Sequence, residues 1–437
     1  MAFVHTESGI CGKTELDLFS VPPTQTEIED GQWVVHHPLS TLTENGPIEF
    51  HIPGAGNDYI DLANTRLLVK AKITKSTGGD IVDADKVAPI NLLLHSLFTQ
   101  VDVSLNEKLV TPSTNTYPYR AYIETLLSHG GDAQQSRLTT SMWYKDKAGY
   151  HDAAANMANN PGLNTRRSIM SGSKSVEMIG RLHIDFCHQP RYLINGIDVK
   201  LRLVRSKNEF ALMASGDDMF KIQITEACLY VRKCQLSPSV LLHHAKALET
   251  TNVKYPIQRV ETKVFSIPSG NLSATQENLF LGQLPRRIII GMVDTDAYNG
   301  SYLKSPFNFK HNNLNFLALF IDGKQVPAKP LQPNFDVTTG TQYTRCYQTL
   351  FEGTGRVDDD AGNTISLSEY PLGFTLYAFD LTPDLCDGDH LNLRKKGNLR
   401  LEMQFSTALT AASNVVVYAE FENLVEVDKS RNIIFDY

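Results

Sequence analysis

His183 and Asp185, two positions apart, are the residues best spaced to do chemistry in this sequence. The apolar alternation from Met178 to Phe186 predicts a strand, and residues i and i+2 of a strand lie on one face. A histidine beside a carboxylate is the arrangement of a general base with its orienting group. Because no nucleophile or third group lies nearby in the sequence, we interpret the two as a hydrogen-bonded pair on the surface.

Two pairs of adjacent histidines, His36–His37 and His243–His244, are further candidates for metal ligands. Neighbours on a strand point to opposite faces, so such a pair would share one ion with difficulty. We predict no metal site from them. If His183 instead met His243 and His244 in one pocket, the chain would be better explained as a metalloenzyme.

Two acidic groups offer oxygen ligands of the kind that bind divalent cations. Asp294 and Asp296 follow a predicted strand, and Asp358-Asp359-Asp360 lies in a glycine-containing loop. Neither group has the twelve-residue spacing of a calcium loop. We interpret both as solvated turn residues.

The six cysteines lie far apart and form no C-x-x-C pair, so neither a zinc site nor a disulfide framework is indicated. We expect buried free thiols in a reducing compartment. The residues are Cys11, Cys187, Cys228, Cys234, Cys346 and Cys386.

Motifs for nucleotide binding or nucleophilic catalysis are absent from the sequence. Gly54 and Gly56 in PGAGND have no following G-K-[ST], so a tight turn explains them, and neither G-x-S-x-G nor H-E-x-x-H occurs. The aromatic residues lack the interleaved Lys and Arg of a base-stacking platform, which favours packing in the core and between subunits. These aromatics are Tyr117, Tyr119, Tyr122, Phe307, Phe309, Phe316 and Phe320. We predict no catalytic, cofactor-binding or metal-binding residue.

Charge and composition narrow the class of protein. The net charge of −7 and pI near 6.0 argue against a broad grip on nucleic-acid phosphates. With 437 residues, 42% of them hydrophobic, the chain suits two globular domains of about 200 residues each. No apolar run approaches the ~20 residues of a membrane span, and the start lacks the pattern of a secretory signal, so we expect an intracellular protein.

Short stretches of alternating apolar residues, separated by turn residues, predict a protein built mainly of strands. Longer spacing predicts helices over Tyr119–His129 and Ser239–Leu248. The predicted strands are Ile48–Ile52, Arg66–Ile73, Gln100–Val110, Met178–Phe186, Val199–Leu203, Lys221–Lys233, Val260–Ile267, Arg287–Val293, Asn315–Val326, Asn398–Phe405 and Val415–Val427.

The strand pattern occurs twice. The hairpin segment Asn106–Val110 matches Asp322–Val326 at a distance of 216 residues, and Leu201–Leu203 matches Leu399–Leu401 at 198. Each copy has two strands, a polar hairpin, a long excursion and two further strands. We predict two tandem antiparallel jelly rolls of eight strands each, an all-β fold with long loops and a few short helices.

The predicted boundaries follow from these patterns. We expect an acidic N-terminal arm, a helical linker between the two jelly rolls, and one excursion in each jelly roll. The ranges are 1–45 for the arm, 46–236 for the first jelly roll with an excursion at about 131–175, 237–256 for the linker, and 257–437 for the second jelly roll with an excursion at about 332–389.

Three runs of sequence, Pro89–Val110, Asn115–Gly130 and Pro306–Phe335, resemble the double jelly-roll major capsid proteins of Polinton (Maverick) elements and adintoviruses. The resemblance touches both halves of the chain. It implies a structural protein without enzymatic activity or cofactor. Three copies would form a pseudo-hexagonal capsomer, and capsomers would tile an icosahedral shell around double-stranded DNA.

The same resemblance implies partners and a location. The chain would contact itself, neighbouring capsomers, a single jelly-roll vertex protein and minor capsid proteins. It would be made in the host cytoplasm and end in the virion capsid, without a membrane span or sequence-specific binding to nucleic acid. Two alternatives remain open, namely a metalloenzyme on paired jelly rolls and an assembly module that a host has kept from an integrated element.

Overall fold

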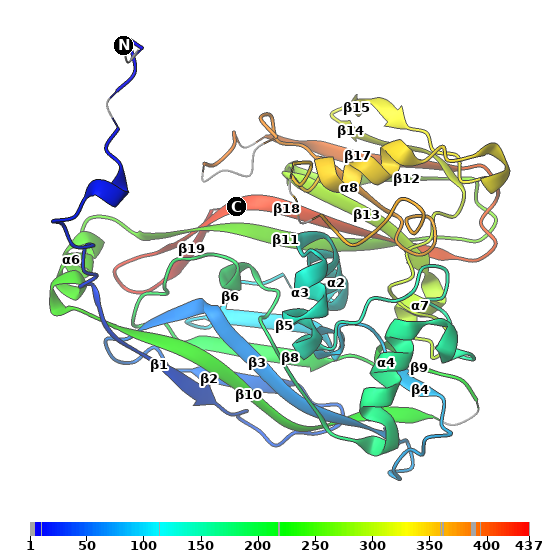
Figure 1. The fold of residues 1–437 in the computed structure, drawn as a ribbon, viewed down its shortest axis with the longest axis horizontal. Helices are drawn as coiled ribbons and strands as arrows, with labels where there is room; N and C mark the ends of the chain where they lie inside the picture. The colour runs from blue at the N-terminus through cyan, green and yellow to red at the C-terminus, as the bar shows by residue number, and fades with distance from the viewer. Residues whose placement is uncertain are drawn as a thin grey trace.

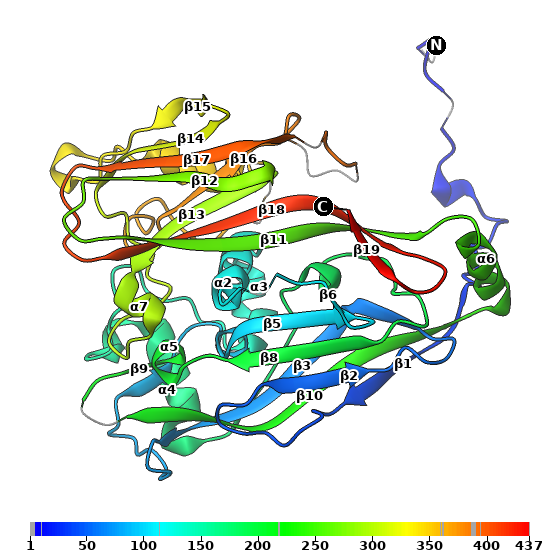
Figure 2. The same cartoon turned by 180° about the vertical axis from the view of Figure 1, so that it is seen from behind.

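Strands dominate the computed structural model, which describes residues 5–9, 11–112, 114–216, 219–358, 360, 362–385, 390–393 and 395–436. They form two sandwiches, one above the other in Figure 1, with the N-terminal half below and the C-terminal half above. Residues 5–9 and 11–27 lead away from both sandwiches in the views of Figures 1 and 2.

The first sandwich consists of two four-stranded antiparallel sheets. Its inward residues alternate along the strands, for example Ile48, Phe50 and Ile52, because successive side chains of a strand point to opposite faces. The first sheet orders β1 (Ile28–His36), β10 (Phe220–Leu236), β3 (Tyr59–Lys75) and β7 (Val176–Gly180), and the second orders β2 (Ile48–Ile52), β8 (Val199–Arg205), β5 (Phe98–Leu105) and β6 (Lys108–Leu109).

The second sandwich repeats this plan, and β19 (Ile433–Asp436) additionally pairs with β18. Its first sheet orders β11 (Val253–Ile267), β18 (Ser413–Val427), β13 (Arg287–Asp294) and β16 (Leu376–Asp380), and its second orders β12 (Ser273–Gln283), β17 (Lys396–Phe405), β14 (Leu314–Ile321) and β15 (Lys324–Leu331). A separate small sheet pairs β4 (Val87–Pro89) with β9 (Leu212–Ala214).

The spatial order of strands is the same in both sandwiches. The sheet β1-β10-β3-β7 corresponds strand for strand to β11-β18-β13-β16. The facing sheet β2-β8-β5-β6 corresponds in the same way to β12-β17-β14-β15. Two Greek-key units that close into facing four-stranded sheets are a jelly roll. The chain is therefore a double jelly roll, which confirms the predicted fold.

Matching hairpins mark the repeat most clearly. Asn106–Glu107 joins β5 to β6 and Asp322–Gly323 joins β14 to β15, with positive φ at both residues of each turn, as a two-residue type I′ turn requires. In each copy the first turn side chain accepts a 2.8 Å bond from a neighbouring strand's backbone N–H, that of Asp198 or Asn398.

The strand register corrects one of the two predicted offsets. Leu105 pairs with Val199 in the first jelly roll, and Ile321 pairs with Leu399 in the second. The hairpins are thus 216 positions apart, as predicted, but the strands beside them are 200 apart and not 198. A slip of two residues keeps every side chain on its face, so the apolar pattern alone cannot detect it.

Four strands differ from the predictions. β1 lies inside the segment predicted as an arm, and β16 lies inside the predicted second excursion. β7 ends at Gly180, so residues 181–186 are not a continuation of a strand. β15 runs through Pro327 and Pro330, beyond the predicted strand end at Val326. β15 is an edge strand, and an edge tolerates the missing N–H of proline.

Helices are short and lie mostly between the strands of each copy. The predicted helices are present as α2 and α6. Among the described residues, no helix is both long and apolar enough to span a membrane. The helices are α1 (Leu93–Ser96), α2 (Tyr117–Ser128), α3 (Gly131–Gln135), α4 (Pro161–Met170), α5 (Asn208–Ala211), α6 (Pro238–Leu248), α7 (Thr295–Asn299) and α8 (Thr344–Glu352), with 3₁₀ turns η1 (Thr14–Leu16), η2 (Arg137–Ser141), η3 (Met157–Asn159), η4 (Ser171–Ser173), η5 (Asp185–Cys187) and η6 (Val337–Thr339).

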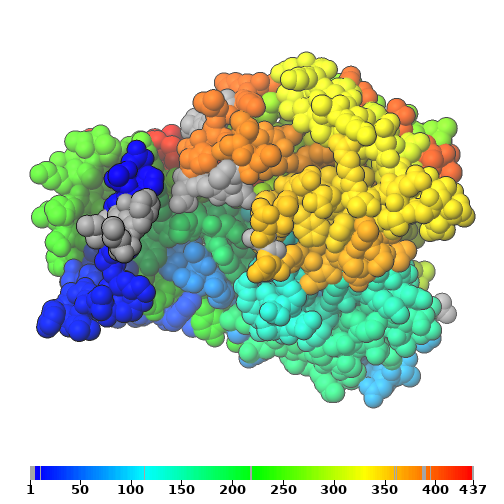
Figure 3. Space-filling model, turned by 45° about the horizontal axis from the view of Figure 1, so that its top comes forward, coloured from blue at the N-terminus to red at the C-terminus, as the bar shows by residue number. Residues whose placement is uncertain are grey.

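The two long excursions contact each other. Lys145 of the first forms a 2.9 Å ion pair with Glu369 of the second, and Thr364 donates a 2.8 Å bond to the side chain of Gln134. Figure 3 shows the same meeting on the surface, where the yellow and orange atoms of the second excursion lie against the cyan and green atoms of the first. The excursions therefore form one continuous face.

Candidate functional site

Helix α2 lies between the two jelly rolls and joins their cores. Ten of its twelve residues are buried, as expected for a helix that is packed on all sides. Tyr122 stacks on Phe307 of the second half with ring centroids 4.1 Å apart, and Tyr119 contacts Phe307 and Phe309 edge-on. These four rings are buried, which confirms the predicted packing role in the core for them, whereas Phe316 and Phe320 are only half-buried.

The polar side of α2 carries a buried ion pair one helical turn apart. Arg120 Nε donates a 2.8 Å bond to Glu124 Oε1, and Arg120 Nη2 lies 2.8 Å from Asp185 Oδ1. Arg120 and Asp185 are 8% and 1% exposed. The Arg120 guanidinium therefore forms ion pairs with two carboxylates, away from solvent.

The second jelly roll supplies the remaining contacts of this network. The Tyr418 hydroxyl of β18 donates a 3.2 Å bond to Glu124 Oε1, and the Val260 N–H of β11 donates a 3.2 Å bond to Asp185 Oδ1. Hydrogen bonds that cross between the two halves fix their relative position, because buried polar groups are costly to leave unpaired. The network is thus part of the joint between the jelly rolls.

His183 and Asp185 both belong to this network, but they are not a pair. His183 Nδ1 lies 2.6 Å from Glu124 Oε2, whereas Asp185 is bound by Arg120. The prediction of a surface pair on one strand face is wrong, since β7 has ended and η5 turns the chain inward at Asp185. Sequence reasoning missed Arg120 and Glu124, although their i,i+4 spacing on a predicted helix is the usual signal of an ion pair.

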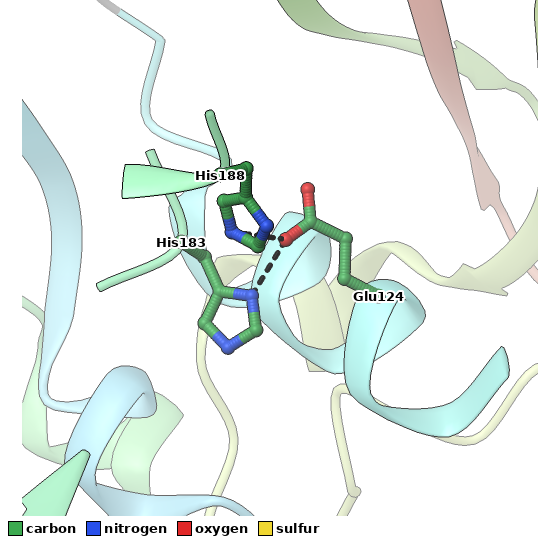
Figure 4. A group of neighbouring side chains, drawn as sticks. All are labelled: Glu124, His183 and His188. Atoms are coloured by element: carbon green, nitrogen blue, oxygen red, sulfur yellow. Dashed lines mark hydrogen bonds and ion pairs between the residues drawn. The ribbon is translucent and has the colours of Figure 1, made fainter. Parts of the chain in front are cut away.

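His188 completes a group of three possible metal ligands with Glu124 and His183. Figure 4 shows both imidazoles directed at the Glu124 carboxylate, and the His188 Nε2 to Oε2 distance is 3.6 Å. One ligand atom from each residue lies within 4.8 Å of the others. Two histidines and a glutamate match the donor set of many zinc sites.

The charge state of the group favours a structural role over acid–base chemistry. Burial alone would raise the pKa of Glu124, but Arg120 and the two histidines outweigh it and hold that pKa well below its usual range. Burial lowers the pKa of His188 to about 3. A carboxylate held this firmly in its ionised form is a poor proton acceptor at neutral pH.

The other predicted histidine candidates lie elsewhere. His243 and His244 are on α6, where His244 Nδ1 is 2.9 Å from the Tyr59 hydroxyl, and both line a different hollow from His183. His36 lies on β1 and His37 follows it. The convergence of His183 with His243 and His244, which would have indicated a metalloenzyme, does not occur.

The first acidic group, Asp294 and Asp296, is paired with lysines. Asp294 lies 2.7 Å from Lys310 Nζ and 3.2 Å from Lys304 Nζ, and Asp296 lies 3.2 Å from Lys304. Asp294 is 8% exposed, so its description as a solvated turn residue is wrong. In the second acidic group Asp358 and Asp360 are exposed, as predicted, and Asp359 lies outside the described residues.

Gly54 and Gly56 lie at the turn after β2, and the described cysteines differ in exposure. Gly54 packs against the backbone of Ile197, where an added Cβ would come within 2.3 Å, and Gly56 has φ of +103° in the turn between β2 and β3. Cys11 is exposed, contrary to the prediction, while Cys187, Cys228, Cys234 and Cys346 are buried free thiols. Cys386 lies outside the described residues.

Comparison with known proteins finds one sequence relative and several structural ones. No family model matches the chain. The sequence is 27% identical over 429 residues to Uncharacterized protein F54H12.2 of Caenorhabditis elegans, covering 95% of this chain and 99% of that protein.

The structural likeness extends over the whole chain. The fold is similar to a chain of the Sputnik virophage (TM-score 0.64, 12% identity, 100% of this chain and 94% of that one) and of the PBCV-1 virus capsid (0.61, 11%, 96% and 99%). It is also similar to the mavirus major capsid protein (0.54, 12%, 100% and 97%). At these identities the likeness establishes the fold, a double jelly roll of the kind found in viral major capsid proteins.

Proposed function

We propose that this chain is the major capsid subunit of a Polinton- or adintovirus-like virus, and that it acts through shape and self-association rather than catalysis. The observation that carries the proposal is the pair of jelly rolls with identical strand order, matched end to end by capsid proteins. Two similar units per chain allow three chains to approximate six-fold symmetry, which suits a pseudo-hexagonal capsomer in an icosahedral shell around double-stranded DNA.

Different parts of the chain have different roles in the proposed capsomer. Each jelly roll acts as one domain, α6 links them, and the joined excursions form the outward face of the capsomer. A single jelly-roll vertex protein and minor capsid proteins complete the shell in the host cell. The lysine-bridged contact between the excursions supports this assignment, because a tower must be rigid to project from a shell.

Purified protein is expected to form a homotrimer. Light scattering coupled to size exclusion should give a mass about three times the 48.7 kDa of one chain, and electron micrographs should show particles with three-fold symmetry. A subunit that stays monomeric at high concentration, without three-fold particles, would contradict the proposal.

The N-terminal arm should matter for assembly and little for folding. Leu16, Leu18, Phe19 and Val21 are 75–99% exposed, and a row of exposed apolar side chains marks a contact surface. Deleting residues 5–26 is expected to leave the melting temperature nearly unchanged, because the side chains of residues 5–9 and 11–26 are exposed. The deletion is expected to reduce association of trimers into larger particles. The measurement is light scattering of assembling trimers, with Val337→Ser as a control that alters an equally exposed apolar residue of the second excursion. Equal loss of assembly in the control would contradict a specific role for the arm.

A second candidate is an assembly module encoded by an animal host. The full-length relative in Caenorhabditis elegans favours it. The two proposals share the fold and the trimer, and they differ in whether the gene lies alone in a host genome or beside other viral genes. Sequencing the flanking region separates them.

A further inference from the structure

A hollow of about 390 Å³ opens at the edge of the first jelly roll, beside His183 and His188. Its wall is built from β3, α1, the end of α2, η2 and the residues that follow β7. Its size falls within the range of ordinary small-ligand sites.

The side chains that line the hollow include three arginines. Arg66, Arg137 and Arg181 all line it, and no Asp or Glu does so among the described residues. None of the three arginines forms an ion pair within the described chain, and Arg181 Nε is buried without a hydrogen-bond partner. Burial lowers the pKa of Arg66, repulsion from Arg181 and Arg137 adds to the effect, and the nearby Asp61 carboxylate opposes it.

Two buried arginines elsewhere in the described chain are paired with carboxylates. Arg120 is bound by Glu124 and Asp185, and Arg166, 1% exposed, lies 2.6 Å from Asp146. The whole chain has 48 acidic against 41 basic residues, so carboxylates are not scarce. Arg66 donates bonds to the carbonyl oxygens of Ala63 and Thr65, but within the described ranges none of the three guanidiniums at the hollow has a carboxylate partner. The hollow therefore suits a negative charge supplied from outside the chain.

We propose that this hollow binds a small phosphate-type oxyanion with more than one negative charge. Guanidinium groups present paired N–H donors that match phosphate oxygens in a bidentate manner. His129 and the Thr125 hydroxyl lie on the same wall and offer further polar contacts. A Zn²⁺ ion on Glu124, His183 and His188 would instead meet the repulsion of the neighbouring arginines, so the charge of the wall decides between the two ligands.

The test is a thermal unfolding and calorimetric titration of the full-length protein with sodium tripolyphosphate, against sodium chloride at matched ionic strength. Tripolyphosphate is expected to raise the melting temperature saturably, since a ligand of the folded state stabilises it in proportion to its occupancy. Arg137→Gln and Arg181→Gln should each weaken binding roughly tenfold. Arg137 is exposed and makes no side-chain hydrogen bond, so its substitution leaves the fold intact.

Arg202→Gln is the matched control, because it removes the same charge from an exposed arginine paired with Glu49 on another sheet. It should bind tripolyphosphate as the native chain does. Equal weakening in all three variants would reduce the effect to general charge and overturn the proposal. So would saturable stabilisation by zinc chloride that His188→Ala abolishes, or arginine-dependent binding of a short thymidine oligomer without binding of tripolyphosphate.

Discussion

Replacing Arg120 with methionine is expected to lower the free energy of unfolding by about 3–5 kcal/mol, since removing one partner of a buried ion pair leaves uncompensated charge. Methionine fills a similar volume, so the loss reports charge more than packing. Both Glu124 and Asp185 would lose their cation, and Asp185 is 1% exposed. Chemical denaturation followed by tryptophan fluorescence measures the change.

The pH dependence of this loss has a definite sign. In the native chain the depressed pKa of Glu124 contributes stability above its unfolded pKa, and this is lost as pH falls through the folded value. Without Arg120, burial dominates and the pKa values of Glu124 and Asp185 rise. Lowering the pH then protonates these two carboxylates and removes the uncompensated buried charge that destabilises the variant. The stability difference should therefore shrink between pH 7 and roughly pH 5.

The exposed Arg202→Met is the control for this experiment and should change stability by less than about 1 kcal/mol, the usual worth of a surface ion pair. A loss in Arg120→Met that is equal at both pH values would show that packing, not charge, is responsible.

Replacing Phe307 with alanine is expected to cost about 3–5 kcal/mol, as for other large aromatic side chains removed from a core. Phe307 is 0% exposed and stacks on Tyr122, so the cavity would open between the two jelly rolls. Unfolding of the native chain should be one transition. In the variant it should broaden or split, because the loss falls on the contact that couples the halves.

Phe320→Ala removes the same side chain from β14, where the ring is half-buried beneath the Arg400 guanidinium at 4.5 Å. We expect a cost of about 1 kcal/mol there and no change in the number of transitions. If Phe307→Ala and Phe320→Ala had equal effects, Phe307 would not be a special point of coupling.

The fold was predictable because most strands have a recognisable pattern within a short stretch of sequence. Alternation in β2 and β8 and the type I′ turns at Asn106 and Asp322 depend on residues within a few positions of one another. The missed strands lack that signal. β1 exposes Trp33 and Val35 and alternates weakly, and β16, Leu376–Asp380, is buried on both faces and so has no period of two.

The polar network was less predictable because its members come from four distant segments. The helical spacing of Arg120 and Glu124 was visible, but their approach to Asp185 depends on where β7 ends, and their approach to Tyr418 depends on how the jelly rolls dock. The same holds for the three arginines of the hollow, which lie on β3, on η2 and just after β7. The relative positions of residues within one helix or strand can be predicted from the sequence. Contacts between distant helices and strands cannot.

The position of α2 has a consequence for how the molecule is made. Tyr119, Tyr122 and Leu126 belong to the same core as Ile288, Val417 and other residues of the second jelly roll. During synthesis the N-terminal half emerges first, so α2 has to wait with its apolar surface uncovered until more than half of the chain has followed. The two jelly rolls therefore have the same strand order but are not equivalent in folding, because helix α2 of the first is part of the core of the second.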